Sequence, residues 1–86
     1  MTIEELMVKR ENGKRKIFPS GKTFKSFTEV YDYCFEYGST LKPRLDILVL
    51  KFRILDSNEV FGVAISWDKD NEVYVNLEFP RLDWVN

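Results

Sequence analysis

Apolar and polar residues alternate in three runs along the second half of the chain. Every second residue is strongly apolar across 48–54, 61–67 and 73–79. A period of two is typical of strands that have one face in the core and the other partly exposed to solvent. Polar clusters at 56–59 and 68–71 supply the turns between the runs. The pattern therefore predicts an antiparallel meander of three strands.

Two shorter runs near the N-terminus, 6–10 and 14–18, flank the dipeptide Asn12-Gly13. Asn-Gly favours a tight hairpin turn because both residues tolerate the positive φ angles that such a turn requires. The pattern predicts a β-hairpin. Pro19, which lacks a backbone donor, and Gly21 are expected to end its second strand.

The segment between the hairpin and the meander has a helical period instead. Ser26 and Glu29 have the spacing of a capping box, in which each satisfies a backbone donor at the helix start. Gly38 is placed where a left-handed residue often ends a helix. We predict a helix over about 27–37. Its apolar face comprises Phe27, Val30, Tyr31, Cys34 and Phe35.

The predicted order is β-β-α-β-β-β, which indicates an α+β domain of two layers. A single helix would cover one face of an antiparallel sheet. The 86 residues fit one domain spanning 1–86. The pattern leaves open whether the hairpin joins the sheet of the meander.

Composition points to a reducing compartment and away from membranes. Cys34 is the one cysteine, so no intramolecular disulfide can form. The most apolar stretch, 47–50, is far shorter than the roughly 20 residues of a membrane helix. Met1 is followed by Thr-Ile-Glu-Glu, with no basic region leading into the apolar run of a signal peptide. We expect a cytoplasmic protein.

The tripeptide Gly21-Lys22-Thr23 matches the end of a phosphate-binding loop. Such a loop needs a second glycine separated by four residues, between a strand and a helix. Here Gly13 is separated from Gly21 by seven residues. The sequence therefore predicts a turn, and no nucleotide.

Residues 68–72 place oxygen ligands at alternate positions, as a calcium loop does. Val73 stands where that loop requires glycine, so a hairpin turn is the favoured interpretation. The chain contains no histidine, the commonest general base and metal ligand. Cys34 lies on the apolar helix face, where a thiol is usually inert. We expect no catalysis, no metal and no cofactor.

Charge is distributed unevenly along the chain. Residues 1–25 hold seven basic and three acidic residues, a net charge of +4, whereas the other 61 residues carry −5. A basic β-ribbon can follow a phosphate backbone, although lysine on an edge hairpin also blocks edge-to-edge pairing. The candidate nucleic-acid contacts are Lys9, Arg10, Lys14, Arg15, Lys16, Lys22 and Lys25.

The other candidate surface is the meander face that points away from the predicted helix. Small residues at 62, 64 and 66 form a row between larger ones, which predicts a shallow, flat trough. Such a surface suits a protein partner, a second copy or the chain's own tail. The tail tryptophan could dock internally or anchor a partner. The candidate protein contacts are Lys51, Arg53, Ala64, Tyr74 and Trp84.

Residues 61–65, Phe-Gly-Val-Ala-Ile, share an aromatic-glycine pair with a strand of the RNA-recognition module. That module has two helices and stacks bases on open-face aromatics, where this chain offers chiefly Tyr74, so it does not match. The leading prediction is a small, non-enzymatic protein-binding module, comparable to small inhibitors and antitoxins, that uses the open sheet face and the tail. The alternative is RNA or DNA binding through the N-terminal hairpin.

Overall fold

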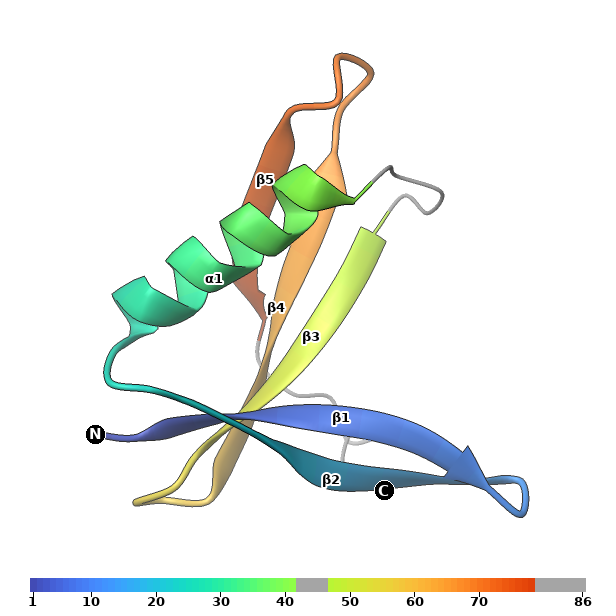
Figure 1. The fold of residues 1–86 in the computed structure, drawn as a ribbon, viewed down its shortest axis with the longest axis vertical. Helices are drawn as coiled ribbons and strands as arrows, with labels where there is room; N and C mark the ends of the chain where they lie inside the picture. Colours follow the sequence, from blue (N-terminus) through green and yellow to red (C-terminus); the bar gives the residue numbers. More distant parts are fainter. Residues whose placement is uncertain (42–46, 79–86) are drawn as a thin grey trace.

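The computed structural model describes residues 1–41 and 47–78 of the chain. Its elements follow the predicted order β-β-α-β-β-β, and one helix lies against one antiparallel sheet (Figure 1). The predicted two-layer α+β architecture is therefore confirmed. The elements are β1 (Ile3–Glu11), β2 (Lys14–Phe24), α1 (Phe27–Thr40), β3 (Ile47–Ile54), β4 (Glu59–Trp67) and β5 (Val73–Glu78).

The hairpin and the meander form one five-stranded sheet with the order β2-β1-β3-β4-β5. The two parts meet where residues 3–6 of β1 pair with residues 51–54 of β3. The sequence had left this junction open. Figure 1 shows that β1 and β2 cross the direction of β3, β4 and β5 steeply. The sheet is therefore strongly twisted at the junction.

The core lies between α1 and one face of the sheet. The apolar residues that alternate along β3 and β4 point toward the helix, and Val30 and Cys34 point back from it. Three aromatic contacts connect this core, with ring centroids 5.9 Å apart for Phe24–Phe52 and 5.5 Å apart for Phe52–Phe61. The third contact, Phe27–Phe61, has a separation of 5.3 Å. The buried core residues are Ile3, Phe24, Val30, Cys34, Phe52, Phe61, Val63 and Ile65.

The helix begins as the capping box predicts, with one difference. Ser26 has an extended backbone, and its hydroxyl accepts a hydrogen bond from the Glu29 backbone N–H at 3.2 Å. The Glu29 carboxylate accepts from the backbone N–H of Lys25 at 2.6 Å, one residue before the cap. Both bonds satisfy backbone donors at the helix entry.

Two predictions about the helix are wrong. Gly38 does not end α1, which continues to Thr40. Phe35 was assigned to the buried face, yet 54% of its surface is exposed. The buried residues of α1 are Val30, Cys34 and Gly38, which repeat every four positions, so Phe35 falls at the margin of the contact.

The predicted end of β2 is also wrong. β2 continues through Pro19 and Gly21 to Phe24. Leu6 pairs with Pro19 and Glu4 with Thr23, so residues 20–22 form a bulge opposite one residue of β1. Gly21 has φ +87°, which accounts for glycine there. The tripeptide 21–23 thus lies inside an edge strand rather than between a strand and a helix.

No helix in the described parts of the chain, 1–41 and 47–78, is long and apolar enough to cross a membrane.

Candidate functional site

The N-terminal hairpin extends beyond the rest of the sheet as a two-stranded arm. Among the described residues, 1–41 and 47–78, β1 and β2 pair only with each other from Met7 to Phe18, because β3 pairs with β1 no further than Leu6. Figure 1 shows this arm running away from α1 and from β3 to β5. Five paired positions at about 3.3 Å per residue make the arm about 15 Å long. We call residues 7–18 the basic arm.

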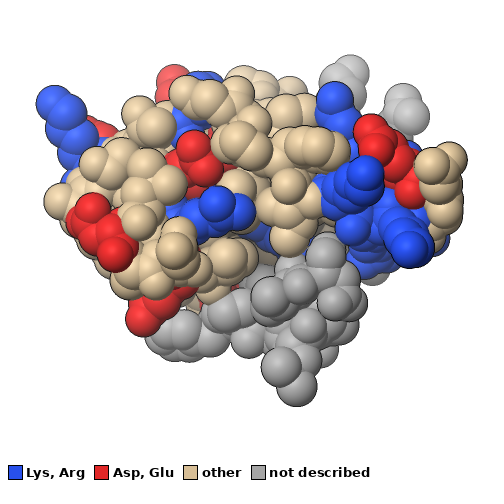
Figure 2. Space-filling view, turned by 90° about the horizontal axis from the view of Figure 1, so that it is seen from below, with Lys and Arg blue, Asp and Glu red and all other residues tan. Residues whose placement is uncertain are grey.

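The charged residues of the basic arm lie at its free end. Asn12 and Gly13 form the predicted tight turn, with φ angles of 52° and 77°. Figure 2 shows lysine and arginine side chains gathered at this end of the molecule. Five cations and one anion give the arm a net charge of +4. The exposed charged residues are Lys9, Arg10, Glu11, Lys14, Arg15 and Lys16.

The strand register divides these charges between the two faces of the arm. Residues directly opposite each other in an antiparallel pair share a face, and successive residues alternate faces. Arg10 is opposite Arg15, and these two residues define what we call the arginine face. Lys9 is opposite Lys16, one step along, and Glu11 is opposite Lys14. Those four residues lie on the other side, which we call the lysine face.

The two faces differ in how far their charges are compensated. On the lysine face, the Lys16 ammonium lies 3.2 Å from the Glu11 carboxylate, and the Lys9 ammonium lies 5.9 Å from the centre of the Phe18 ring. Among the residues that the structure describes, neither Arg10 nor Arg15 has a hydrogen-bond or ion-pair partner. Like charges directly opposite each other destabilise a strand pair. Within the described parts of the chain, the positive charge of the arginine face is therefore uncompensated.

Two of the seven predicted nucleic-acid contacts lie away from this end. Lys22 belongs to the bulge, and its ammonium lies 4.3 Å from the centre of the Tyr33 ring on α1. Lys25 precedes the helix, and its backbone is held by Glu29. The structure thus brings five predicted cations together and places two beside the helix.

The helix-distal face of the meander carries four of the five predicted protein contacts. Lys51, Arg53, Ala64 and Tyr74 occupy positions that alternate with the core residues of β3, β4 and β5. Tyr74 is 48% exposed, whereas Ala64, at the centre of the predicted trough, is only 5% exposed. Trp84 lies outside the described residues.

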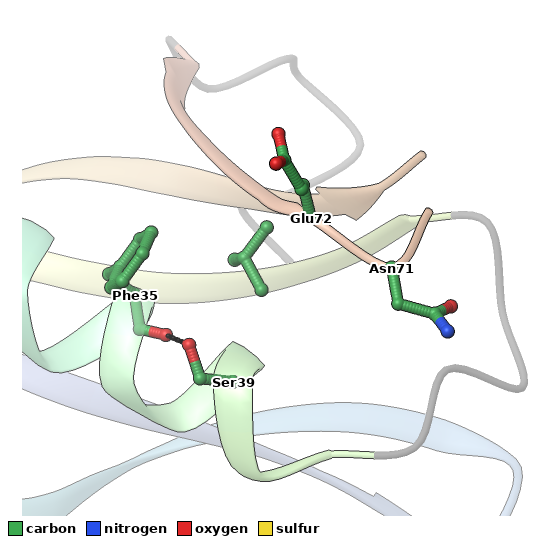
Figure 3. A pocket seen from close by; sticks show the side chains of 5 residues that line it. Phe35, Ser39, Asn71 and Glu72 are labelled. Atoms are coloured by element: carbon green, nitrogen blue, oxygen red, sulfur yellow. Dashed lines mark hydrogen bonds between the residues drawn. The ribbon is translucent and has the colours of Figure 1, made fainter. Parts of the chain in front are cut away.

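A groove of about 410 Å³ lies between the end of α1 and the turn before β5. Its lining residues are Phe35, Ser39, Asn71, Glu72 and Val73. The Ser39 hydroxyl donates to the Phe35 carbonyl oxygen at 2.8 Å, and Figure 3 shows Asn71 and Glu72 pointing away from Phe35. In a binding pocket for a small ligand, a few polar groups converge on the ligand. The polar groups of this groove do not converge (Figure 3).

Two titratable side chains of α1 are shifted toward their neutral forms. Burial, with a smaller contribution from the Glu5 carboxylate, raises the pKa of the Cys34 thiol to about 12. Burial and a hydrogen bond with Glu5 also raise the pKa of Tyr33. A thiol with such a high pKa holds almost no thiolate at neutral pH and is therefore a poor nucleophile.

The acidic segment before β5 forms the predicted turn. The Asp68 carboxylate accepts from the backbone N–H groups of Asp70 at 2.8 Å and Glu72 at 3.0 Å, and from the Tyr74 hydroxyl at 3.0 Å. These bonds, and above all the one from the Glu72 backbone N–H, lower the pKa of Asp68 below its ordinary value. In the described parts of the chain, no three His, Cys, Asp or Glu side chains are placed to hold a metal ion.

Comparisons with protein-family models, with curated proteins and with solved structures find no match. The chemistry of the described residues is therefore the basis for any functional proposal.

The sequence analysis found the arm's cations but missed how they are divided between its faces. The signal was present, because a two-residue turn at Asn12-Gly13 places Glu11 opposite Lys14 and so determines every later pair. The separation of the arm from the body had no such local signal.

Proposed function

We propose that the protein binds nucleic acid through the basic arm. The observation that carries this proposal is the concentration of five exposed cations, with a net charge of +4, at the free end of a ribbon whose two strands, in the described part of the chain, pair only with each other. Such a ribbon presents both faces to a ligand. A phosphate backbone is a dense line of negative charge that basic side chains neutralise, with release of its counterions.

The charge on the rest of the molecule favours binding with the arm turned toward the nucleic acid. The 61 residues after position 25 carry a net charge of −5. An acidic body is repelled by a polyanion, so the field of the whole protein favours an approach with the arm first. In this proposal the protein is a non-enzymatic binding module. Its cytoplasmic location stays a prediction.

The sequence ranked protein binding above nucleic-acid binding, and we reverse that order. The predicted protein surface has Ala64 at its centre, and a side chain that is 5% exposed offers little contact area. The charged residues of the arm are all exposed. The side chains of the arm are therefore more accessible to a ligand than the centre of the helix-distal face is.

Charge reversal on the arm tests the proposal. We expect the unmodified protein to bind short DNA or RNA at about 50 mM salt, and to bind about 100-fold more weakly at about 200 mM if four phosphates are neutralised. Arg15→Glu should weaken binding strongly, as measured by fluorescence anisotropy. The matched control is Lys69→Glu, which makes the same charge change in an exposed turn of the body. Equal affinity of the two variants would contradict the proposal.

A protein-binding role for the helix-distal face is the second candidate. Two side chains favour it, because Ile47 is 57% exposed and Tyr74 is 48% exposed. Ile47 and Tyr74 both lie opposite Ser66 of β4, so the two side chains share one row across this face, and contiguous exposed apolar surface is typical of contact surfaces. A second copy of the chain is the simplest partner to test. Concentration-dependent dimerisation in sedimentation experiments that Ile47→Arg abolishes would support this role, and a monomer at all concentrations would exclude self-association.

A further inference from the structure

The chemistry of the arm's two faces distinguishes them as ligand contacts. The lysine face already contains the Lys16–Glu11 ion pair. The arginine face carries two guanidinium groups directly opposite each other, without a partner among the described residues. A cross-strand arginine pair is unfavourable in the free protein, so an external acceptor would relieve it. As far as the described residues go, the arginine face is therefore the one with unused hydrogen-bond donors.

The dimensions of the arm match one nucleic-acid groove better than the others. Two paired strands lie about 4.8 Å apart. The major groove of B-form DNA is about 12 Å wide and about 8.5 Å deep and admits a two-stranded ribbon. The arm's free length of about 15 Å exceeds that depth, so the body can remain outside the groove. The major groove of A-form RNA is too narrow for side chains to read.

Guanidinium groups have a preferred base in that groove. Arginine donates two hydrogen bonds to O6 and N7 of guanine, which is the commonest base-specific contact in protein–DNA complexes. Lysine on the other face would reach phosphates, because a flexible ammonium acts as a point charge. The arginine face thus has the chemistry to contact bases, and the lysine face has the chemistry to contact phosphates.

We infer that the ligand of the basic arm is duplex DNA, and that Arg10 and Arg15 enter its major groove to contact guanine. This inference rests on the proposed function and names its substrate class. Arg10 and Arg15 determine base preference, and Lys9 and Lys14 contribute affinity without preference.

The experiment compares binding to an alternating GC duplex and an alternating AT duplex, each of about 20 base pairs, at about 100 mM salt. We expect the unmodified protein to prefer the GC duplex by about tenfold or more. Replacing guanine by 7-deazaguanine removes the N7 acceptor and should reduce that preference. The double variant Arg10→Lys/Arg15→Lys keeps the charge but loses the planar guanidinium group, so its preference for the GC duplex should be smaller than that of the unmodified protein.

The matched control changes the lysine face. Lys9→Gln/Lys14→Gln should weaken binding to both duplexes while keeping the GC preference. Equal, salt-sensitive binding of GC and AT duplexes by the unmodified protein would overturn guanine contact and leave the proposed function standing. Tighter binding to an RNA duplex or to single strands would overturn the choice of duplex DNA. Binding to none of these probes would overturn both proposals.

Discussion

At Gly38, α1 packs closely against β4 and β5. A Cβ atom built there would lie 2.7 Å from Ile65 Cγ2 and 2.9 Å from Val73 Cγ1, closer than real Cβ atoms approach. The Gly38 carbonyl accepts a hydrogen bond from the Trp67 indole N–H at 3.1 Å. Glycine within this helix therefore permits close packing on β4 and β5 rather than ending the helix.

Gly38→Ala should destabilise the domain even though alanine is the better helix former. The added methyl group overpacks the contact with Ile65 and Val73, which typically costs about 1–3 kcal/mol. Urea denaturation measures the change in the free energy of unfolding. Thr28→Ala, on the exposed side of the same helix, is the control and should change it by less than about 0.5 kcal/mol. A Gly38→Ala protein as stable as the original would contradict this packing.

Cys34 should behave as a core residue with no reactivity in the native state. It has no exposed surface, and its pKa is raised from 9.0 to about 12. At pH 8, a thiol reagent should therefore modify the native protein only as fast as the protein unfolds. The same reagent should modify the protein in urea at once. Rapid reaction of the native thiol would contradict the burial.

The raised pKa of Cys34 makes the free energy of unfolding depend on pH in the alkaline range. The fold favours the neutral thiol, so its contribution is fully present below pH 9.0 and is lost as the pH rises toward 12. The urea midpoint should fall over that range.

At the scale of elements, the basic arm is a hairpin that carries two like charges directly opposite each other. Arg10 and Arg15 face each other, and no described acidic residue relieves them. Because, among the described residues, the strands of the arm pair only with each other beyond Leu6, changes at its tip should not reach the core.

Arg15→Glu should leave the domain folded and slightly more stable while it weakens nucleic-acid binding. The substitution replaces a like-charge pair with an opposite-charge pair, worth roughly 0.2–1 kcal/mol. Thermal unfolding at low salt measures the gain, and high salt should reduce it. The control is Lys69→Glu, which creates no cross-strand pair. A loss of stability in Arg15→Glu would show that Arg15 has a structural role.

Sequence periodicity predicted the elements well, and their ends poorly. The alternating runs, the Asn-Gly turn and the Ser26 cap are local signals, and each led to the observed strand, turn or helix start. The ends of β2 and α1 were wrong because both depend on distant neighbours. Pro19 remains in a strand because it pairs with Leu6, and Gly38 remains helical against Ile65.

At the scale of the whole molecule, the site follows from a difference in strand length. β1 continues past the four residues that pair with β3, and β2 follows it, so the hairpin projects. Its cations could be read from the sequence, but their isolation from the acidic body depends on this topology. The result is a molecule with a basic arm at one end, as Figures 1 and 2 show.

The most direct test of nucleic-acid binding by the arm is the salt dependence of affinity for duplex DNA. We expect the logarithm of the association constant to fall with the logarithm of salt concentration with a slope of about −4, corresponding to about four neutralised phosphates. Arg10→Glu/Arg15→Glu should remove measurable binding at about 50 mM salt. No binding by the unmodified protein at that salt concentration, or an unchanged slope and affinity in the double variant, would contradict the proposed role of the arm.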